Sequence, residues 1–183
     1  PEHGSHALAS LRFRDFRLLW IGQLVSITGD QMQTVGIAWQ LYQLTNSPLR
    51  LGLLGLVRAV PFMTFSLAGG ALADALDRTR LLVVTQTVQM SVTSVLVVVT
   101  ATGHTTAALL YGVTFLSGAS AAFDGPARQA MIPNLVPRRE LSSAMTSITL
   151  LRRTAMIAGP GIGGVVIGQF GLASNYFGNA ISF

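Results

Sequence analysis

The sequence contains no cysteine and no lysine, and only 10% of its 183 residues are charged. Without cysteine the chain forms no disulfide and no cysteine-based metal site. A soluble domain would carry about 25% charged residues, so this chain has too little charge to cover a surface that faces water. Its formal net charge is +5, because arginines outnumber aspartates and glutamates. These arginines lie in short groups between long apolar runs, unlike the basic face of a nucleic-acid-binding protein.

Half of the residues are hydrophobic, and they gather in runs that reach the length needed to cross a membrane, about 20 mostly apolar residues. Breaker residues separate the runs, such as Asn46 and Pro48 after the first and Pro133 and Pro137 after the fourth. The first run lacks a small-residue cleavage site and is expected to be a retained helix. After a polar tail at residues 1–17, the sequence therefore predicts an all-α, polytopic membrane bundle over 18–183. Its expected helices cover about 18–44, 49–73, 81–101, 106–127, 141–168 and, incompletely, 172–183.

The arginines alternate between the two sides of the predicted bundle. The N-terminal tail and the loops after the second and fourth helices hold most of them, whereas the opposite loops hold only Arg50. Loops rich in lysine and arginine stay in the cytoplasm. We therefore expect a cytoplasmic N-terminus, with these residues on the same side: Arg12, Arg14, Arg17, Arg78, Arg80, Arg128, Arg138 and Arg139.

The first predicted helix carries a polar stripe at steps of three or four residues, formed by Gln23, Ser26, Asp30 and Gln33. Asp30 lies about twelve residues, or about 18 Å, into this helix, near the centre of a bilayer. A charge at that depth costs at least about 2.5–3.5 kcal/mol, so it normally faces a cavity or a partner. Asp30 is thus a candidate proton-binding carboxylate. The alternative is a structural aspartate that is permanently paired with an arginine.

Three arginines also lie deep in predicted helices, Arg58 in the second and Arg152 and Arg153 in the fifth. Three deep cations against one deep acid leave positive charge uncompensated. One arginine can relieve it by reaching an interface with its long side chain, and another by binding an anionic group of a substrate. The alternative is that these arginines only pair with Asp30 or with backbone carbonyls.

The fourth predicted helix carries Ser117 and Ser120, which are expected to face a cavity, and Asp124 four residues before Arg128. This spacing lets an acid and a base pair on one face of a helix. Because the pair lies near the cytoplasmic end, we expect it to act as a gate or a topology anchor more than as a substrate ligand.

The end of the second predicted helix combines a glycine, an acid and two arginines: Gly70, Asp74, Arg78 and Arg80. The glycine permits close helix approach, and the arginines can hold the acid or the end of the helix. The segment resembles the signature between helices 2 and 3 of the major facilitator superfamily, which forms part of that family's cytoplasmic gate. Ala75 stands where the signature often has a basic residue, and Asp77 where it often has glycine.

The fifth predicted helix contains the element Gly159-Pro160-Gly161-Ile162-Gly163-Gly164. It resembles the Gly-Pro element of antiporter branches of the same superfamily, and Pro160 is expected to bend the helix for alternating access. Generic glycine packing between helices is the alternative. The glycines also match a dinucleotide-binding pattern, but that motif follows a strand, and a helical run surrounds it here.

Further segments resemble a branch of drug and siderophore exporters that includes macrolide-efflux and enterobactin-exporter-like proteins. The resemblance covers about Leu11 to Phe183. Thr114 stands where many drug antiporters carry an arginine, so their coupling route does not transfer and Asp30 becomes the main candidate. The matching segments are Phe16-Arg17, Gly29-Asp30, 45–48, 58–61, 123–137 and Glu140-Leu141.

The resemblance implies the N-terminal bundle of a transporter built from two six-helix halves, with the sequence ending inside helix 6 and the C-terminal half as a missing partner. It implies a multi-pass protein of the cell (plasma or inner) membrane that exchanges an outward drug-like or siderophore-like molecule against inward protons. It implies no enzyme activity, no cofactor, no metal and no nucleic-acid partner. An importer of the same fold and a non-transporting membrane scaffold or sensor are the alternatives.

The residue roles that we expect follow from these motifs and from the buried polar residues. Asp30 couples transport to protons. The substrate cavity is expected to include Gln23, Gln33, Arg58, Ser117, Ser120 and Arg152. The cytoplasmic gate is expected to include Gly70, Asp74, Arg78, Arg80, Asp124 and Arg128. The bend of helix 5 is assigned to Gly159, Pro160, Gly163 and Gly164.

Overall fold

The computed structural model describes the backbone of residues 9–75 and 78–183, and the side chains of residues 10–66 and 79–183. Within these residues the protein consists of helices and contains no strand, as the sequence predicts. A short 3₁₀ turn, η1 (Ala9–Arg12), precedes α2 (Arg14–Thr45) and α3 (Pro48–Ala75). These are followed by α4 (Arg78–Ala101), α5 (Ala107–Leu135), the 3₁₀ turn η2 (Arg138–Glu140) and α6 (Leu141–Ile181).

Local sequence signals set several helix ends. α2 ends at Thr45 because Asn46 adopts a left-handed conformation with φ 47°, and its N–H donates to the Tyr42 carbonyl over 2.8 Å. Asparagine is one of the residues that tolerate this conformation at a helix end. α5 begins after Thr106, whose hydroxyl accepts a hydrogen bond from the N–H of Leu109 over 3.3 Å. This contact satisfies one of the free donors of the first turn.

α5 continues past the predicted end of the fourth helix, which the sequence places near residue 127. Instead α5 runs to Leu135 with Pro126 and Pro133 inside it. A proline inside a helix costs about 3 kcal/mol or more. The additional turns bury Ile132, which is 1% exposed, in a cluster with Phe16 of α2. Burial of apolar side chains therefore offsets the lost backbone hydrogen bond.

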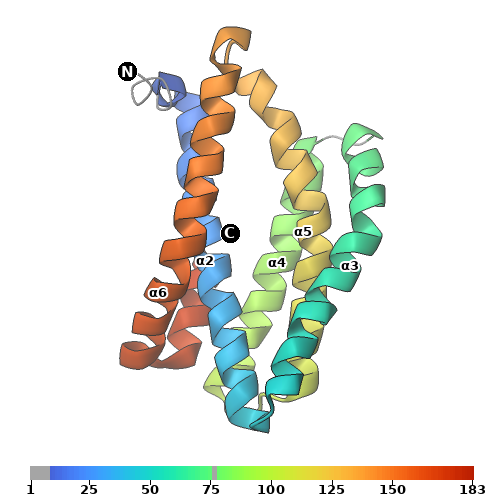
Figure 1. The fold of residues 1–183 in the computed structure, drawn as a ribbon, viewed down its shortest axis with the longest axis vertical. Coiled ribbons are helices and arrows are strands. Elements are labelled where there is room, and N and C mark those ends of the chain that lie inside the picture. The colour runs from blue at the N-terminus through green and yellow to red at the C-terminus, as the bar shows by residue number, and fades with distance from the viewer. Residues whose placement is uncertain (1–8, 76–77) are drawn as a thin grey trace.

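α6 consists of two helices joined at Gly171, where φ is 83° and ψ is 173°. Glycine adopts such a conformation without a steric penalty. Both sides of the break meet Met32 of α2, since a Cβ on Gly163 would lie 3.0 Å from its Cα and Asn175 donates to its carbonyl over 2.9 Å. In a straight helix residues 163 and 175 would lie about 18 Å apart. The chain therefore reverses at Gly171 (Figure 1), inside the break that the sequence predicts between residues 168 and 172.

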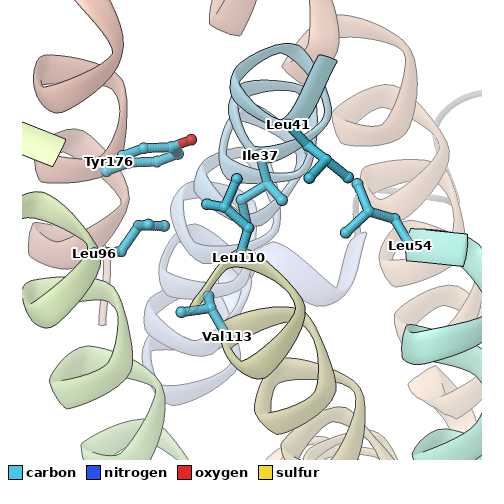
Figure 2. Close-up of a cluster of buried hydrophobic side chains, with 7 residues drawn as sticks. All are labelled: Ile37, Leu41, Leu54, Leu96, Leu110, Val113 and Tyr176. Atoms are coloured by element: carbon cyan, nitrogen blue, oxygen red, sulfur yellow. The ribbon is translucent and has the colours of Figure 1, made fainter. Parts of the chain in front are cut away.

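Two groups of helices form the bundle (Figure 1). α2 packs most extensively on α6, and α3 packs most extensively on α5. α4 contacts both α5 and α6 and so joins the two groups. Apolar side chains from every helix meet in one buried cluster (Figure 2), which consists of Ile37, Leu41, Leu54, Leu96, Leu110, Val113 and Tyr176.

A second cluster holds the other end of the bundle together. Phe16, at the start of α2, is fully buried against side chains from the end of α5 and the start of α6. Arg12 also forms an ion pair with Glu140 over 2.8 Å. The beginnings of α2, α4 and α6 share this upper end in Figure 1. The arginine-rich segments that begin these helices therefore lie on one side, as their alternation in the sequence predicts.

The outer surface of the bundle is apolar. Ile157 of α6 is 81% exposed and Met63 of α3 is 70% exposed, and extensive apolar exposure marks a surface that contacts membrane or another protein. By length and composition, four segments of the described residues can cross a membrane: Pro48–Ser66, Thr79–Ala101, Ala107–Leu135 and Arg138–Ile181. α2, the first span that the sequence predicts, falls outside this set because polar residues interrupt it, among them the buried Gln23, Ser26, Gln33 and Gln40.

Gly118 sets the distance between α5 and α3. A Cβ on this residue would lie 2.5 Å from the Arg58 carbonyl oxygen and 3.2 Å from the Pro61 ring. Gly118→Ala therefore forces the two helices apart, and we expect a loss of about 1–3 kcal/mol of stability, as for other overpacked sites. Gly112→Ala is the matched control, because a Cβ there meets nothing within 4 Å. Thermal unfolding of the full-length protein should give a lower Tm for Gly118→Ala, and equal Tm values would contradict the close approach.

Candidate functional site

Asp30 lies in the middle of α2 at the junction of three cavities, of about 230, 620 and 50 Å³. The charged groups that line the 620 Å³ cavity with it include Arg58, Asp124 and Arg128. Among the residues whose side chains are described, no arginine forms an ion pair with Asp30. The permanent pair considered from the sequence is thus absent from this part of the chain. The charge of Asp30 is balanced at longer range instead.

The 230 Å³ cavity lies between α2, α3, α4 and α5. Part of its wall is apolar, and the polar part surrounds Asp30 and Arg58. Arg58 donates from Nη1 to the Thr34 hydroxyl over 2.9 Å, a bond that holds the guanidinium group one helical turn from Asp30. The predicted cavity residues that line this space are Gln33, Arg58 and Ser117.

The 620 Å³ cavity lies between α2, α3, α5 and α6, and five charged side chains line it: Asp30, Arg58, Asp124, Arg128 and Arg152. The arginines outnumber the acids by one. The Nε atom of Arg152 is buried and has no hydrogen-bond partner among the described residues. Arg153, the next residue, is exposed and lines none of the three cavities. The structure thus separates two arginines that the sequence places at similar depth.

Asp124 and Arg128 form the ion pair that their spacing predicts, with Nε 2.6 Å from Oδ2. The Thr85 hydroxyl and the Gln86 amide of α4 also donate to Oδ1, over 3.4 and 3.5 Å. The sequence places the pair near a helix end, away from the substrate. However, α5 continues for about three turns beyond Asp124, so the pair lies inside the bundle and lines the 620 and 50 Å³ cavities with Asp30. Its role as a gate stays a prediction.

Gln33 connects α2 to two other helices. Its side-chain oxygen accepts hydrogen bonds from the Thr93 hydroxyl of α4 over 3.0 Å and from the Asn179 amide of α6 over 2.8 Å. Gln33 is 5% exposed and Asn179 is fully buried. Because the side chain of Asn179 also lies against Gly29, the residue before Asp30, this network fixes the surroundings of the acid.

Reasoning from sequence alone does not identify four polar residues near Asp30. Gln86 and Gln89 of α4 line the 50 Å³ cavity, and the side-chain oxygen of each is buried without a hydrogen-bond partner in the described part of the chain. Asn175 and Asn179 bring the last part of α6 onto α2. The members of each pair are three or four residues apart within an apolar helix. That spacing is the signal from which a shared polar face can be predicted.

Of the other predicted residues, Ser120 lines the smallest cavity together with Asp30. Gln23 is buried, has no hydrogen-bond partner among the described residues and lines none of the three cavities. Among the described residues no group of three or more histidines and acids is placed to hold a metal ion. The gate residues Gly70, Asp74 and Arg78 have side chains outside the described part, and Arg80 is exposed.

Two glycines of the element in α6 bring this helix onto α2. A Cβ on Gly159 would lie 2.5 Å from the Cβ of Gln31, and one on Gly163 would lie 3.0 Å from the Cα of Met32. Gly164 faces open space, and Pro160 lies where the backbone stays helical. Packing thus accounts for Gly159 and Gly163, and the bend at Pro160 stays a prediction.

Replacing Gln33 with leucine tests the network around Asp30. Gln33→Leu removes the acceptor that Thr93 and Asn179 share, and a buried donor left without an acceptor costs about 1–3 kcal/mol. Gln43→Leu, at an exposed position of the same helix, is the control. We expect the Tm of the full-length protein to fall for Gln33→Leu and to stay near the wild-type value for Gln43→Leu. Similar Tm values for the two variants would show that the network adds no stability.

A family described as "Transmembrane secretion effector" matches residues 5–183. The staphyloferrin A transporter of Staphylococcus aureus is 27% identical over 166 residues, which cover 90% of this chain and 39% of that protein. Macrolide efflux protein A of Streptococcus pyogenes is 26% identical over 147 residues, which cover 80% of this chain and 36% of that protein. An MFS-type transporter of Bacillus subtilis, YfiS, is 24% identical over 166 residues, which cover 90% of this chain and 39% of that protein.

No solved structure matches the chain. The chain spans about two fifths of the length of the curated relatives it matches. The names of these relatives are those of transporters and efflux proteins, and not those of enzymes. The family match covers every described helix, including α2 with Asp30 and α5 with Asp124. The chain therefore belongs to the major facilitator superfamily, in the family of transmembrane secretion effectors.

Proposed function

We propose that the full-length protein is a secondary transporter that exports a small molecule in exchange for protons, and that Asp30 binds the proton. The observation that carries this proposal is the position of Asp30, an acid without an ion-pair partner among the described side chains, at the junction of three cavities. Acids in this situation inside membranes commonly serve ion or proton pathways. The names of the staphyloferrin A and macrolide relatives support transport, and the second supports export.

Protonation of Asp30 would change the attraction between the two groups of helices. The charged carboxylate on α2 attracts Arg58 on α3 and Arg128 on α5, whereas the neutral acid does not. Direct packing of α2 on α3 and α5 is limited in comparison with its packing on α6. A change in charge at Asp30 therefore affects the contact between α2 and the pair α3 and α5, where few other contacts hold the helices together. This supplies a physical link between proton binding and alternating access.

The 620 Å³ cavity is the proposed binding region for the substrate, together with the half of the protein that this chain does not include. Its volume is in the range of small-molecule sites, about 300–1,000 Å³. Arg152 and Arg58 can donate hydrogen bonds to acceptor oxygens of a drug-like or siderophore-like molecule, while apolar side chains such as Phe62 and Met156 contact its carbon skeleton. The proposed setting is the cell membrane with the arginine-rich side in the cytoplasm.

Asp30→Asn tests the proton-coupling role. In liposomes that contain the full-length protein and carry an imposed pH gradient, we expect Asp30→Asn to lower efflux by about a hundredfold, the scale of a lost proton-transfer group. The substrates to measure are a macrolide and staphyloferrin A. Asp15→Asn makes the same chemical change at an exposed position of the same helix and should leave efflux unchanged. Gradient-driven efflux that survives in Asp30→Asn would remove Asp30 from the coupling mechanism.

Arg152→Gln tests the proposed binding region, and Arg153→Gln is its matched control. Arg152 lines the 620 Å³ cavity with a buried Nε that has no protein partner, whereas its neighbour is exposed. Loss of one hydrogen bond from a charged group should raise the KM for efflux about tenfold, with little change in the maximum rate. The control should keep the wild-type KM. An equal rise of KM in both variants would show that general charge, and not a specific contact, is responsible.

A further inference from the structure

The smallest of the three cavities, here called the inner chamber, is enclosed mainly by polar side chains from three helices. Its volume is about 50 Å³. A drug-sized ligand needs about 300–1,000 Å³, whereas one water molecule needs about 10–15 Å³. The polar residues that line the chamber are Ser26 and Asp30 of α2, Gln86 and Gln89 of α4, and Ser120, Asp124 and Arg128 of α5.

The chamber walls include hydrogen-bond acceptors that lack a partner. The Oε1 atoms of Gln86 and Gln89 are buried without a hydrogen-bond partner among the described residues, and an unsatisfied buried acceptor is destabilising. The carboxylates of Asp30 and Asp124 are acceptors as well. The occupant must therefore donate hydrogen bonds. The guanidinium group of Arg128 in the same wall disfavours a metal cation, so the lining fits water.

The chamber shares lining residues with three larger cavities, among them the 620 Å³ cavity through Asp30, Asp124 and Arg128. Asp30 and Gln89 line it together with the 230 Å³ cavity. Gln86 and Arg128 line it together with a further cavity of about 460 Å³, which extends to Thr79 at the beginning of α4. That helix begins at the arginine-rich end of the bundle (Figure 1). Cavities with shared lining residues thus follow one another from Asp30 past the two glutamines toward this end.

We propose that the inner chamber holds water through which Asp30 exchanges its proton with Asp124. The proton leaves the carboxyl group of Asp30 for a chamber water, and that water passes one of its own protons to the carboxylate of Asp124. Asp124 then releases the proton to a further water beside Gln86 and Arg128, the residues that the chamber shares with the 460 Å³ cavity. Asp30 ends as a carboxylate, and no electron moves. Arg58 on α3, Arg128 on α5 and Arg152 on α6 are the cations placed around Asp30.

This inference rests on the proposed role of Asp30 and adds the path by which its proton leaves. The test replaces both glutamines with methionine, a side chain of similar length that offers no amide, in Gln86→Met/Gln89→Met. Full-length protein in liposomes is assayed twice with the same macrolide. One assay measures efflux driven by a pH gradient, and the other measures exchange of labelled for unlabelled macrolide without a gradient. Exchange does not require Asp30 to release its proton, so it reports folding and substrate binding.

We expect the double variant to lose about tenfold in gradient-driven efflux, since it lacks the positioned proton path, and to retain wild-type exchange. Gln43→Met, at an exposed position of α2, should retain both activities. Unchanged gradient-driven efflux in the double variant would overturn the chamber as the path, and so would an equal loss of both activities. Absence of gradient-driven efflux in the wild type is a different result, because it would overturn the proposed function itself.

A second measurement separates a proton path from altered packing. Infrared difference spectra between the wild type and Asp30→Asn identify the band of the protonated Asp30 carboxyl group. After transfer to deuterated water, the rate at which this band shifts reports exchange at Asp30. We expect that rate to be about tenfold slower in the double variant, because water mediates the transfer. An unchanged rate would show that the proton reaches water by another route.

Discussion

Helix α2 has to bury a row of polar side chains in a bundle whose outer surface is apolar, and the other helices are arranged around this requirement. Gln33 accepts hydrogen bonds from α4 and α6. Gln40 accepts one from Tyr176 over 2.9 Å and donates to Thr105 over 3.1 Å. The last part of α6 supplies Asn175, Tyr176 and Asn179 only because the chain reverses at Gly171. A buried polar group that finds no partner is costly, so this reversal is part of what stabilises the polar face of α2.

The same arrangement leaves Asp30 as a charged group whose partners are shared and not fixed. Its nearest helices carry arginines that are already engaged, Arg58 with Thr34 and Arg128 with Asp124. The balance of charge around it therefore extends over α2, α3, α5 and α6, the helices that line the 620 Å³ cavity. A single proton on Asp30 can influence all of these elements. Proton coupling and substrate binding are thus proposed to share one set of charges.

The sequence predicts the helical class, the shared side of the arginine-rich segments and the Asp124–Arg128 pair. The length of the apolar runs, the alternation of arginines between loops and a spacing of four residues on a helix can each be read from the sequence without knowledge of distant contacts. It does not predict that α5 continues through Pro133, since the burial of Ile132 depends on the distant Phe16. Nor does it separate Arg152 from Arg153. Successive residues point about 100° apart around a helix, and only the neighbouring helices decide which one faces a cavity. Gln86 and Gln89 are three residues apart and can share one face of a helix, but the chamber that they line forms only when α2, α4 and α5 are placed together.

The direction of coupled proton movement tests the central claim most directly. Full-length protein would be reconstituted in vesicles that contain a pH indicator, and a gradient of macrolide would be imposed without a pH gradient. Antiport predicts that protons move against the flow of the macrolide, so that the compartment that gains macrolide loses protons and becomes more alkaline. Acidification of that compartment, or flow of macrolide with no change in pH, would contradict proton exchange as the mechanism.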